Sequence, residues 1–233
     1  MYLTASYDLE KSLELLLHAA TRYAEHAELL ALARQVLTRP AQLNDENRTL
    51  WYAAAIVLSP DEFKNQLADH IRGREEQAAR LLTFICPSLG ITRNFLYRLS
   101  VAALGSLIAI TAPIFQPQDL GGSGWLGLHS RGEAATSVRA LIYRLEKDLT
   151  PEATEALVQL HDDPGLAPWR GDIAFVLANQ ARQRRELVFK YPTVTQVIET
   201  LNQGRAANPA DLQALVSSYL HAISEELRNG PTD

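Results

Sequence analysis

Apolar residues recur three and four positions apart along nearly the whole chain, which is the period of a helix that buries one face. In the second half, Val138, Leu141, Ile142, Leu145 and Leu149 follow this spacing. Strands instead alternate apolar and polar residues, and no stretch does so for more than a few positions. The pattern therefore predicts an all-α fold.

Local signals predict where individual helices start and stop. Capping boxes at residues 59–62 and 193–196, and the Thr-Pro pair at 150–151, predict three helix starts. Gly73 and Gly204 are expected to end the first and the last of these helices. Further helices are expected to begin near Asp8, Asn44, Trp169 and Asn208, and the last of them is expected to close the fold with an apolar stripe.

Short helices joined by short turns pack as antiparallel hairpins, so we expect an irregular bundle or a HEAT-like solenoid. The proline- and glycine-rich loop 116–132 is the expected boundary between an N-terminal helical subdomain, 1–115, and a C-terminal one, 133–233. One continuous domain is the alternative. The glycines within 121–124 are most simply interpreted as part of a flexible loop between helices, and their role is left open.

One uncharged stretch, Leu99 to Phe115, has to be considered as a membrane span. A spanning helix needs roughly 20 predominantly apolar residues. This stretch contains Gly105 and Pro113 before it reaches that length, so it predicts a buried central helix and no membrane contact. The N-terminus lacks the basic and apolar regions of a secretory signal. We therefore expect a cytoplasmic protein.

Composition narrows the classes of protein further. Of the 233 residues, 47% are hydrophobic, which is enough to bury a sizeable core. A single cysteine, Cys86, excludes a disulfide framework and a multi-cysteine zinc site, and is interpreted as a buried structural thiol. The net charge of -5 excludes a globally basic nucleic-acid binder.

No motif supports catalysis. The glycines of 121–124 lack both the spacing of a nucleophile elbow and the lysine of a P-loop. No two of the six histidines have the i,i+4 spacing of a helical metal site. The run His161-Asp162-Asp163 is interpreted as ordinary helix-end chemistry. We therefore predict a protein that is not an enzyme, with no catalytic residues, cofactor or metal site.

The densest basic feature comprises Arg182, Arg184, Arg185 and Lys190. On one continuous helix, Arg182 and Arg185 would project together, with Arg184 rotated away. Such a patch is a candidate contact for a polyanion or an acidic partner. The favoured interpretation is a solvated face on which the arginines pair with neighbouring acidic residues.

From about Leu145 onward, several residues carry a resemblance to a known group of proteins. They are Asp163-Pro164, Trp169, the run Arg185–Phe189 and the run Ala207–Leu215. This segment resembles a helical region of large bacterial defence proteins, upstream of a restriction-endonuclease-like domain and often with a STAND or NACHT-type ATPase elsewhere. The resemblance covers only the C-terminal ~90 residues, and no repeat period defines it.

The nuclease carboxylate-lysine motif and the Walker lysine of those proteins do not occur here. The resemblance therefore implies a scaffold or recognition segment without the catalytic parts. The preferred function is a non-catalytic helical scaffold that binds a protein partner or companion domains, in a bacterial defence system. The alternative is a nucleic-acid-contacting helical module that uses the basic residues at 182–190. The sequence predicts neither the partner nor the oligomeric state.

Overall fold

The computed structural model describes residues 45–86, 99–122, 124–126, 129–184 and 190–205. Helices account for 80% of these residues, which confirms the predicted all-α fold. The α-helices are α3 (Asp45–Leu58), α4 (Pro60–Ile71), α5 (Glu75–Ile85), α6 (Val101–Thr111), α7 (Arg131–Glu146), α8 (Pro151–Asp162), α9 (Arg170–Gln183) and α11 (Pro192–Arg205). Two short 3-10 helices, η3 (Pro117–Asp119) and η4 (Pro164–Trp169), lie between them. The two-residue segments β1 (Trp125–Leu126) and β2 (His129–Ser130) form one short antiparallel pair.

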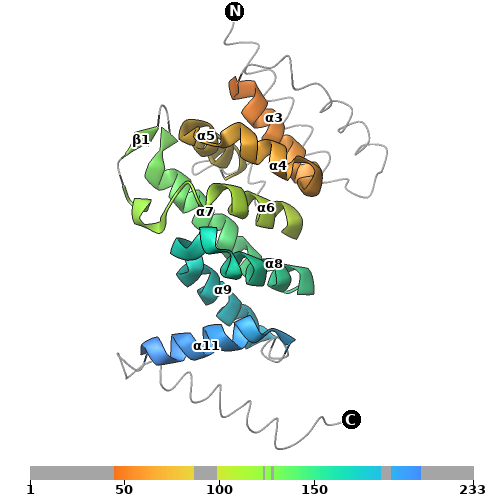
Figure 1. The fold of residues 1–233 in the computed structure, drawn as a ribbon, viewed down its shortest axis with the longest axis vertical. Coiled ribbons are helices and arrows are strands. Elements are labelled where there is room, and N and C mark those ends of the chain that lie inside the picture. Colours follow the sequence, from red (N-terminus) through yellow and green to blue (C-terminus); the bar gives the residue numbers. More distant parts are fainter. Residues whose placement is uncertain (1–44, 87–98, 123, 127–128, 185–189, 206–233) are drawn as a thin grey trace, which may run out of the picture.

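The helices are arranged in a stack, in which each helix packs on the one two positions later (Figure 1). In one layer α4 packs on α6 and α6 on α8, and in the other α5 packs on α7 and α7 on α9. Near the C-terminal end of the described part, α11 lies against α9 (Figure 1). Stacked helix pairs of this kind bury their apolar faces against the neighbouring pairs.

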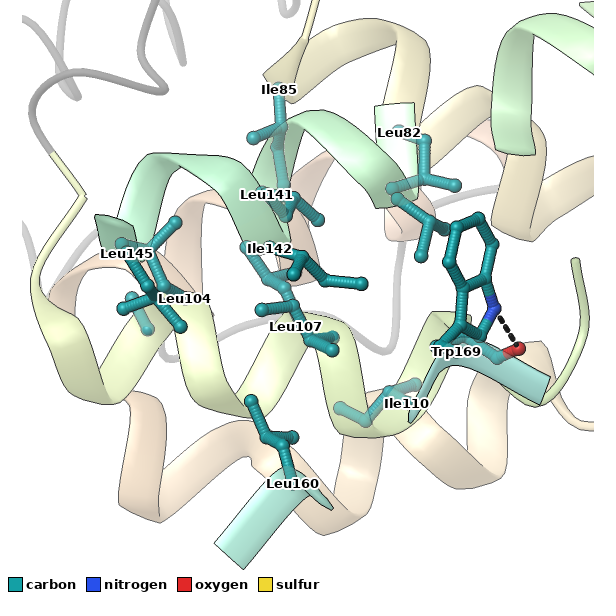
Figure 2. Packing of buried hydrophobic residues seen from close by; sticks show 14 of the residues in the cluster. Leu82, Ile85, Leu104, Leu107, Ile110, Leu141, Ile142, Leu145, Leu160 and Trp169 are labelled. Carbon is teal, nitrogen blue, oxygen red and sulfur yellow. Dashed lines mark hydrogen bonds between the residues drawn. The ribbon is translucent and has the colours of Figure 1, made fainter. Parts of the chain in front are cut away.

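A single hydrophobic cluster runs through the stack, from Trp51 in α3 to Val197 in α11. Figure 2 shows its centre, where Leu104 and Leu107 of α6 lie beside Leu145 and Ile142 of α7. Full burial of one such leucine contributes about 1.5–3 kcal/mol. Described helices on both sides of the loop 116–132 therefore share one core.

The uncharged stretch forms the buried helix that the sequence predicts. Helix α6 has 11 residues, of which Leu104, Leu107 and Ile108 are fully buried. Within the described ranges, no helix combines the length and apolar character needed to cross a membrane.

Helix starts are only partly as expected. Thr150 caps α8, because its hydroxyl oxygen accepts a hydrogen bond from the Ala153 amide at 3.3 Å. Helix α4 also begins where predicted, but the side chain of Ser59 makes no cap hydrogen bond. Its ψ of 72° lies outside the extended conformation in which an N-cap oxygen reaches back to the first turn. An unpredicted capping box is at the start of α7, between Ser130 and Glu133.

The last described helix corrects two boundaries. Helix α11 begins at Pro192, so Thr193 lies inside it, and the Thr193 hydroxyl instead donates to an Asp162 carboxylate oxygen at 3.2 Å. Proline is well suited to a first helical position because its missing N–H has no helical partner there. The helix also passes through Gly204, which was expected to end it. The helices expected near Asp8 and Asn208 lie outside the described residues.

The described part of the loop before α7 is packed against that helix. A Cβ atom on Gly132 would lie 2.7 Å from the Gly122 carbonyl oxygen, so glycine allows the loop to approach the first turn of α7. Gly121 adopts a φ of 75°, a conformation that glycine adopts without strain. Arg131 ties the two together, with its Nε 3.0 Å from Asp119 and further contacts to Glu75 and the Ile114 carbonyl. The described part of the loop therefore packs against α7, a role that its sequence did not indicate.

Candidate interaction surface

The basic residues predicted as a candidate site do not share one helix. Helix α9 ends at Gln183, and Arg184 occupies its C-cap. The helix that was expected to project Arg182 and Arg185 together therefore stops before Arg184. Arg185 itself lies outside the described residues.

Each described basic residue contacts a different part of the molecule. Arg182 is exposed and donates to the Asn179 side-chain oxygen at 3.3 Å. Arg184 donates to the Leu149 carbonyl oxygen, just beyond α7. Lys190 lies 3.8 Å from a Glu155 carboxylate oxygen and 5.0 Å from the centre of the Tyr191 ring. Lys190 thus faces the acidic side chain of α8, whereas Arg182 contacts a neutral side chain of its own helix, α9.

The structure brings together a different set of residues on the surfaces of α7 and α9. Three side chains of α7 each contact one side chain of α9, in the same order along both helices. The contacts are Arg139 Nε to Asp172 at 2.9 Å, the Tyr143 and Phe175 rings at 5.8 Å between centres, and Asn179 to Glu146 at 3.1 Å. We call these six residues, together with Arg182 one turn beyond Asn179, the α7–α9 ladder. The common order of the contacts means that the two helices run in the same direction.

The ladder presents aromatic and basic groups to the outside. Phe175 is 41% exposed, more than the only other exposed large apolar residue in the described ranges, Leu149 at 36%. The Arg139 side chain is 43% exposed and covers Asp172, whose side chain is only 13% exposed. Partial burial, followed by the charge of Asp172, raises the pKa of Tyr143. An exposed aromatic ring between charged groups is suited to binding another macromolecule.

Sequence reasoning missed the ladder, although one signal for it was present. The buried stripe of α9 contains Ile173, Val176 and Leu177, and Phe175 lies off that stripe on the polar side of the helix. A large aromatic residue on a polar helix face is the signal. Its contact with Tyr143, however, depends on two helices far apart in sequence.

Two buried polar side chains, Gln180 and Trp169, form hydrogen bonds that join neighbouring parts of the fold. The amide nitrogen of buried Gln180 donates to the carbonyl oxygens of Leu145 and Asp148 at 2.7 and 3.0 Å, and its amide oxygen accepts from Thr154 at 2.9 Å. The buried Trp169 indole donates to the carbonyl oxygens of Ala112 and Phe115 at 3.1 and 2.8 Å, and Figure 2 includes this side chain with one such bond. Both side chains satisfy carbonyls near the C-terminal ends of earlier helices.

The surroundings of His161 and Cys86 are those of residues that support the fold. His161 lies at the end of α8 with its Nδ1 3.1 Å from Asp162, and its carbonyl accepts from Arg170. Among the residues that the structure describes, no three or more histidine, cysteine or acidic side chains are grouped to hold a metal ion. Burial raises the pKa of Cys86 to about 12, so its thiol stays protonated at neutral pH.

Similarity to known proteins gives no independent guide to this surface. Comparisons of the chain with protein-family models, curated proteins and solved structures find no match.

Proposed function

We propose that this chain is a non-catalytic helical scaffold that binds a protein partner or companion domains. The observation that carries the proposal is the stacking of helix pairs, in which α4, α6 and α8 form one layer and α5, α7 and α9 the other. Helical-repeat proteins with this arrangement bind partners along rows of neighbouring helices. The α7–α9 ladder lies across two such neighbours.

The nucleic-acid alternative has less support. Phosphate binding needs several cations that point at one surface, because each neutralised phosphate contributes to the affinity. Lys190 faces Glu155, and Arg184 donates to the Leu149 carbonyl. Arg182 contacts the neutral Asn179 of its own helix, α9. The overall charge of -5 adds repulsion at long range.

The resemblance of the C-terminal ~90 residues suggests which partners to test first. In the bacterial defence proteins that it resembles, the helical region accompanies nuclease and ATPase domains. We therefore place this scaffold in the bacterial cytoplasm, with a nuclease or ATPase module as the first candidate partner. Its own role is to hold such a module in position.

The test is capture of a partner by the immobilised full chain from a nuclease-treated bacterial lysate, followed by calorimetric titration of the purified partner. We expect saturable binding with fixed stoichiometry and a negative heat-capacity change, because apolar surface is buried. If binding disappears with the nuclease treatment, the scaffold proposal is wrong.

A matched pair of variants separates the two functions. Arg182→Glu removes a cation of the predicted basic patch, and Arg72→Glu removes another exposed arginine, at the C-cap of α4, whose side chain is 78% exposed. A nucleic-acid contact predicts that only the first variant weakens binding to a DNA duplex, with a salt slope of about 0.9 per phosphate contact. The scaffold proposal predicts no specific duplex binding by the wild-type chain.

A further inference from the structure

The charges at the ends of the α7–α9 ladder follow an antisymmetric pattern. On α7 the basic Arg139 comes first and the acidic Glu146 last. On α9 the order is reversed, with Asp172 first and Arg182 last. Because the two helices run in the same direction, Arg139 is level with Asp172, and Glu146 is level with Asn179, one turn before Arg182. The Tyr143–Phe175 pair lies between the two ends.

A surface with this pattern is complementary to itself. Consider two copies that face each other across a two-fold axis parallel to α7 and α9. Each α7 then lies opposite the α9 of the other copy, at the same height. Arg139 lies opposite the partner's Asp172, and Glu146 lies opposite the partner's Asn179, one turn before the partner's Arg182, which its long side chain allows to reach Glu146. Tyr143 faces the partner's Phe175, so aromatic surface is buried while no like charges meet.

We propose that the α7–α9 ladder is an interface between two copies of this chain. Two-fold dimers are the commonest assemblies of identical chains, and they require a self-complementary surface. Arg182 supports this occupant, because within the described part of the chain it contacts a neutral amide and no carboxylate. In the dimer, Glu146 of the second copy supplies its ion pair. This interface goes beyond the proposed function, since a scaffold binds its partner either as a monomer or as a dimer.

The dimensions of the ladder determine how strong the dimer is. From Asp172 to Arg182 the ladder spans about 15 Å of helix, and two neighbouring helices are about 20 Å wide. The area is on the order of 300 Å² per copy, well below the roughly 800 Å² of a standard interface. We therefore expect a reversible dimer that dissociates in the high micromolar range.

The experiment is sedimentation velocity on the full chain, from about 10 µM to about 1 mM, which brackets the expected dissociation constant. The wild type should shift from monomer to dimer over this range. Glu146→Arg places like charges against the partner's Arg182, and Arg182→Glu does the same against the partner's Glu146. Each variant alone should weaken the dimer about tenfold, since both symmetric edges are affected.

An equimolar mixture of the two variants gives the decisive result. At one edge of the mixed dimer the two substituted side chains have opposite charges, and at the other edge the native Glu146 and Arg182 meet. The mixture should therefore dimerise much more strongly than either variant alone. Phe175→Ala should also abolish dimerisation, and Leu149→Ala, which alters the other exposed apolar residue, should not.

Several outcomes overturn the proposal. The proposal is wrong if the wild-type chain stays monomeric at about 1 mM, roughly the weakest association that the assay detects. It is also wrong if the mixture contains no more dimer than either variant alone. If the chain is monomeric and Phe175→Ala abolishes capture of its protein partner, the ladder binds that partner and not a second copy. Capture of a partner by the wild-type chain is measured separately and does not require the dimer, so failure of the dimer is distinguishable from failure of the proposed function.

Discussion

Replacing Gln180 with methionine should destabilise the protein more than any single surface change. Gln180 is fully buried and joins three helices, since it lies on α9, donates to two carbonyls at the end of α7 and accepts from Thr154 on α8. Methionine has nearly the same length and shape but offers no polar hydrogen. The substitution therefore removes the hydrogen bonds while it leaves the packing almost unchanged.

The size of the effect follows from the partners that are left behind. The Leu145 carbonyl keeps a backbone bond from Asp148 at 3.2 Å, and the Thr154 hydroxyl has a second acceptor in the Thr150 carbonyl at 3.4 Å. The Asp148 carbonyl loses the Gln180 amide. With about 1–3 kcal/mol for each buried group that loses a partner, partly offset by these alternatives, we expect a loss of about 2–4 kcal/mol.

Urea denaturation followed by circular dichroism measures this loss, with Gln183→Met at the exposed end of the same helix as the control. The control should change stability by less than about 0.5 kcal/mol. Gln180→Glu gives a second readout, because its carboxylate would face two carbonyl oxygens and its pKa would be raised. Its destabilisation should grow as the pH rises above about 4.3, the ordinary pKa of glutamate. If Gln180→Met is as stable as the control, the hydrogen bonds of Gln180 do not stabilise the stack.

Three further predictions concern single positions within the fold. Trp169→Phe removes the indole N–H that two carbonyls share, and should cost about 2–3 kcal/mol in the same denaturation assay; a loss below about 0.5 kcal/mol would contradict its role. Gly132→Ala should destabilise by more than about 1 kcal/mol, because its Cβ would meet the Gly122 carbonyl, whereas Gly171→Ala, with open space around it, should be neutral or stabilising; equal effects would refute the close approach. Cys86 has a pKa of about 12, so at pH 8 about one thiol in 10,000 is ionised, and iodoacetamide should label the native chain more than about 1,000-fold more slowly than the urea-unfolded chain. Comparable labelling rates would show that Cys86 is accessible.

Local signals in the sequence predicted helices better than their exact ends. The Thr-Pro pair at 150–151 was correctly predicted to start a helix, because the extended backbone of Thr150 brings its hydroxyl to the Ala153 amide in the first turn. Ser59 has the same local chemistry, but its ψ of 72° moves the hydroxyl away from the first turn. Gly204 continues a helix that it was expected to end. Propensity is a weak prior, and the surrounding structure overrides it at such positions.

The candidate surface required information that no local pattern contains. The sequence-based interpretation placed the basic patch on a helix that continues to residue 185. That placement was wrong, because α9 ends at Gln183. The ladder depends on α7 and α9 lying side by side in the same direction, with more than 30 residues between Tyr143 and Phe175. Periodicity indicates which residues share one helix face, but it does not indicate which faces of two helices meet.

The donors Trp169 and Gln180 have a consequence for how the chain can be divided. Trp169 binds carbonyls at the end of α6, and Gln180 binds carbonyls at the end of α7, so each earlier helix depends on a later segment for its last hydrogen bonds. A fragment that stops after α8 would expose the ends of α6 and α7 together with the apolar faces that α9 covers. The stack should therefore fold and unfold as one cooperative unit through α9, and a cut between α8 and α9 should not release a stable N-terminal half.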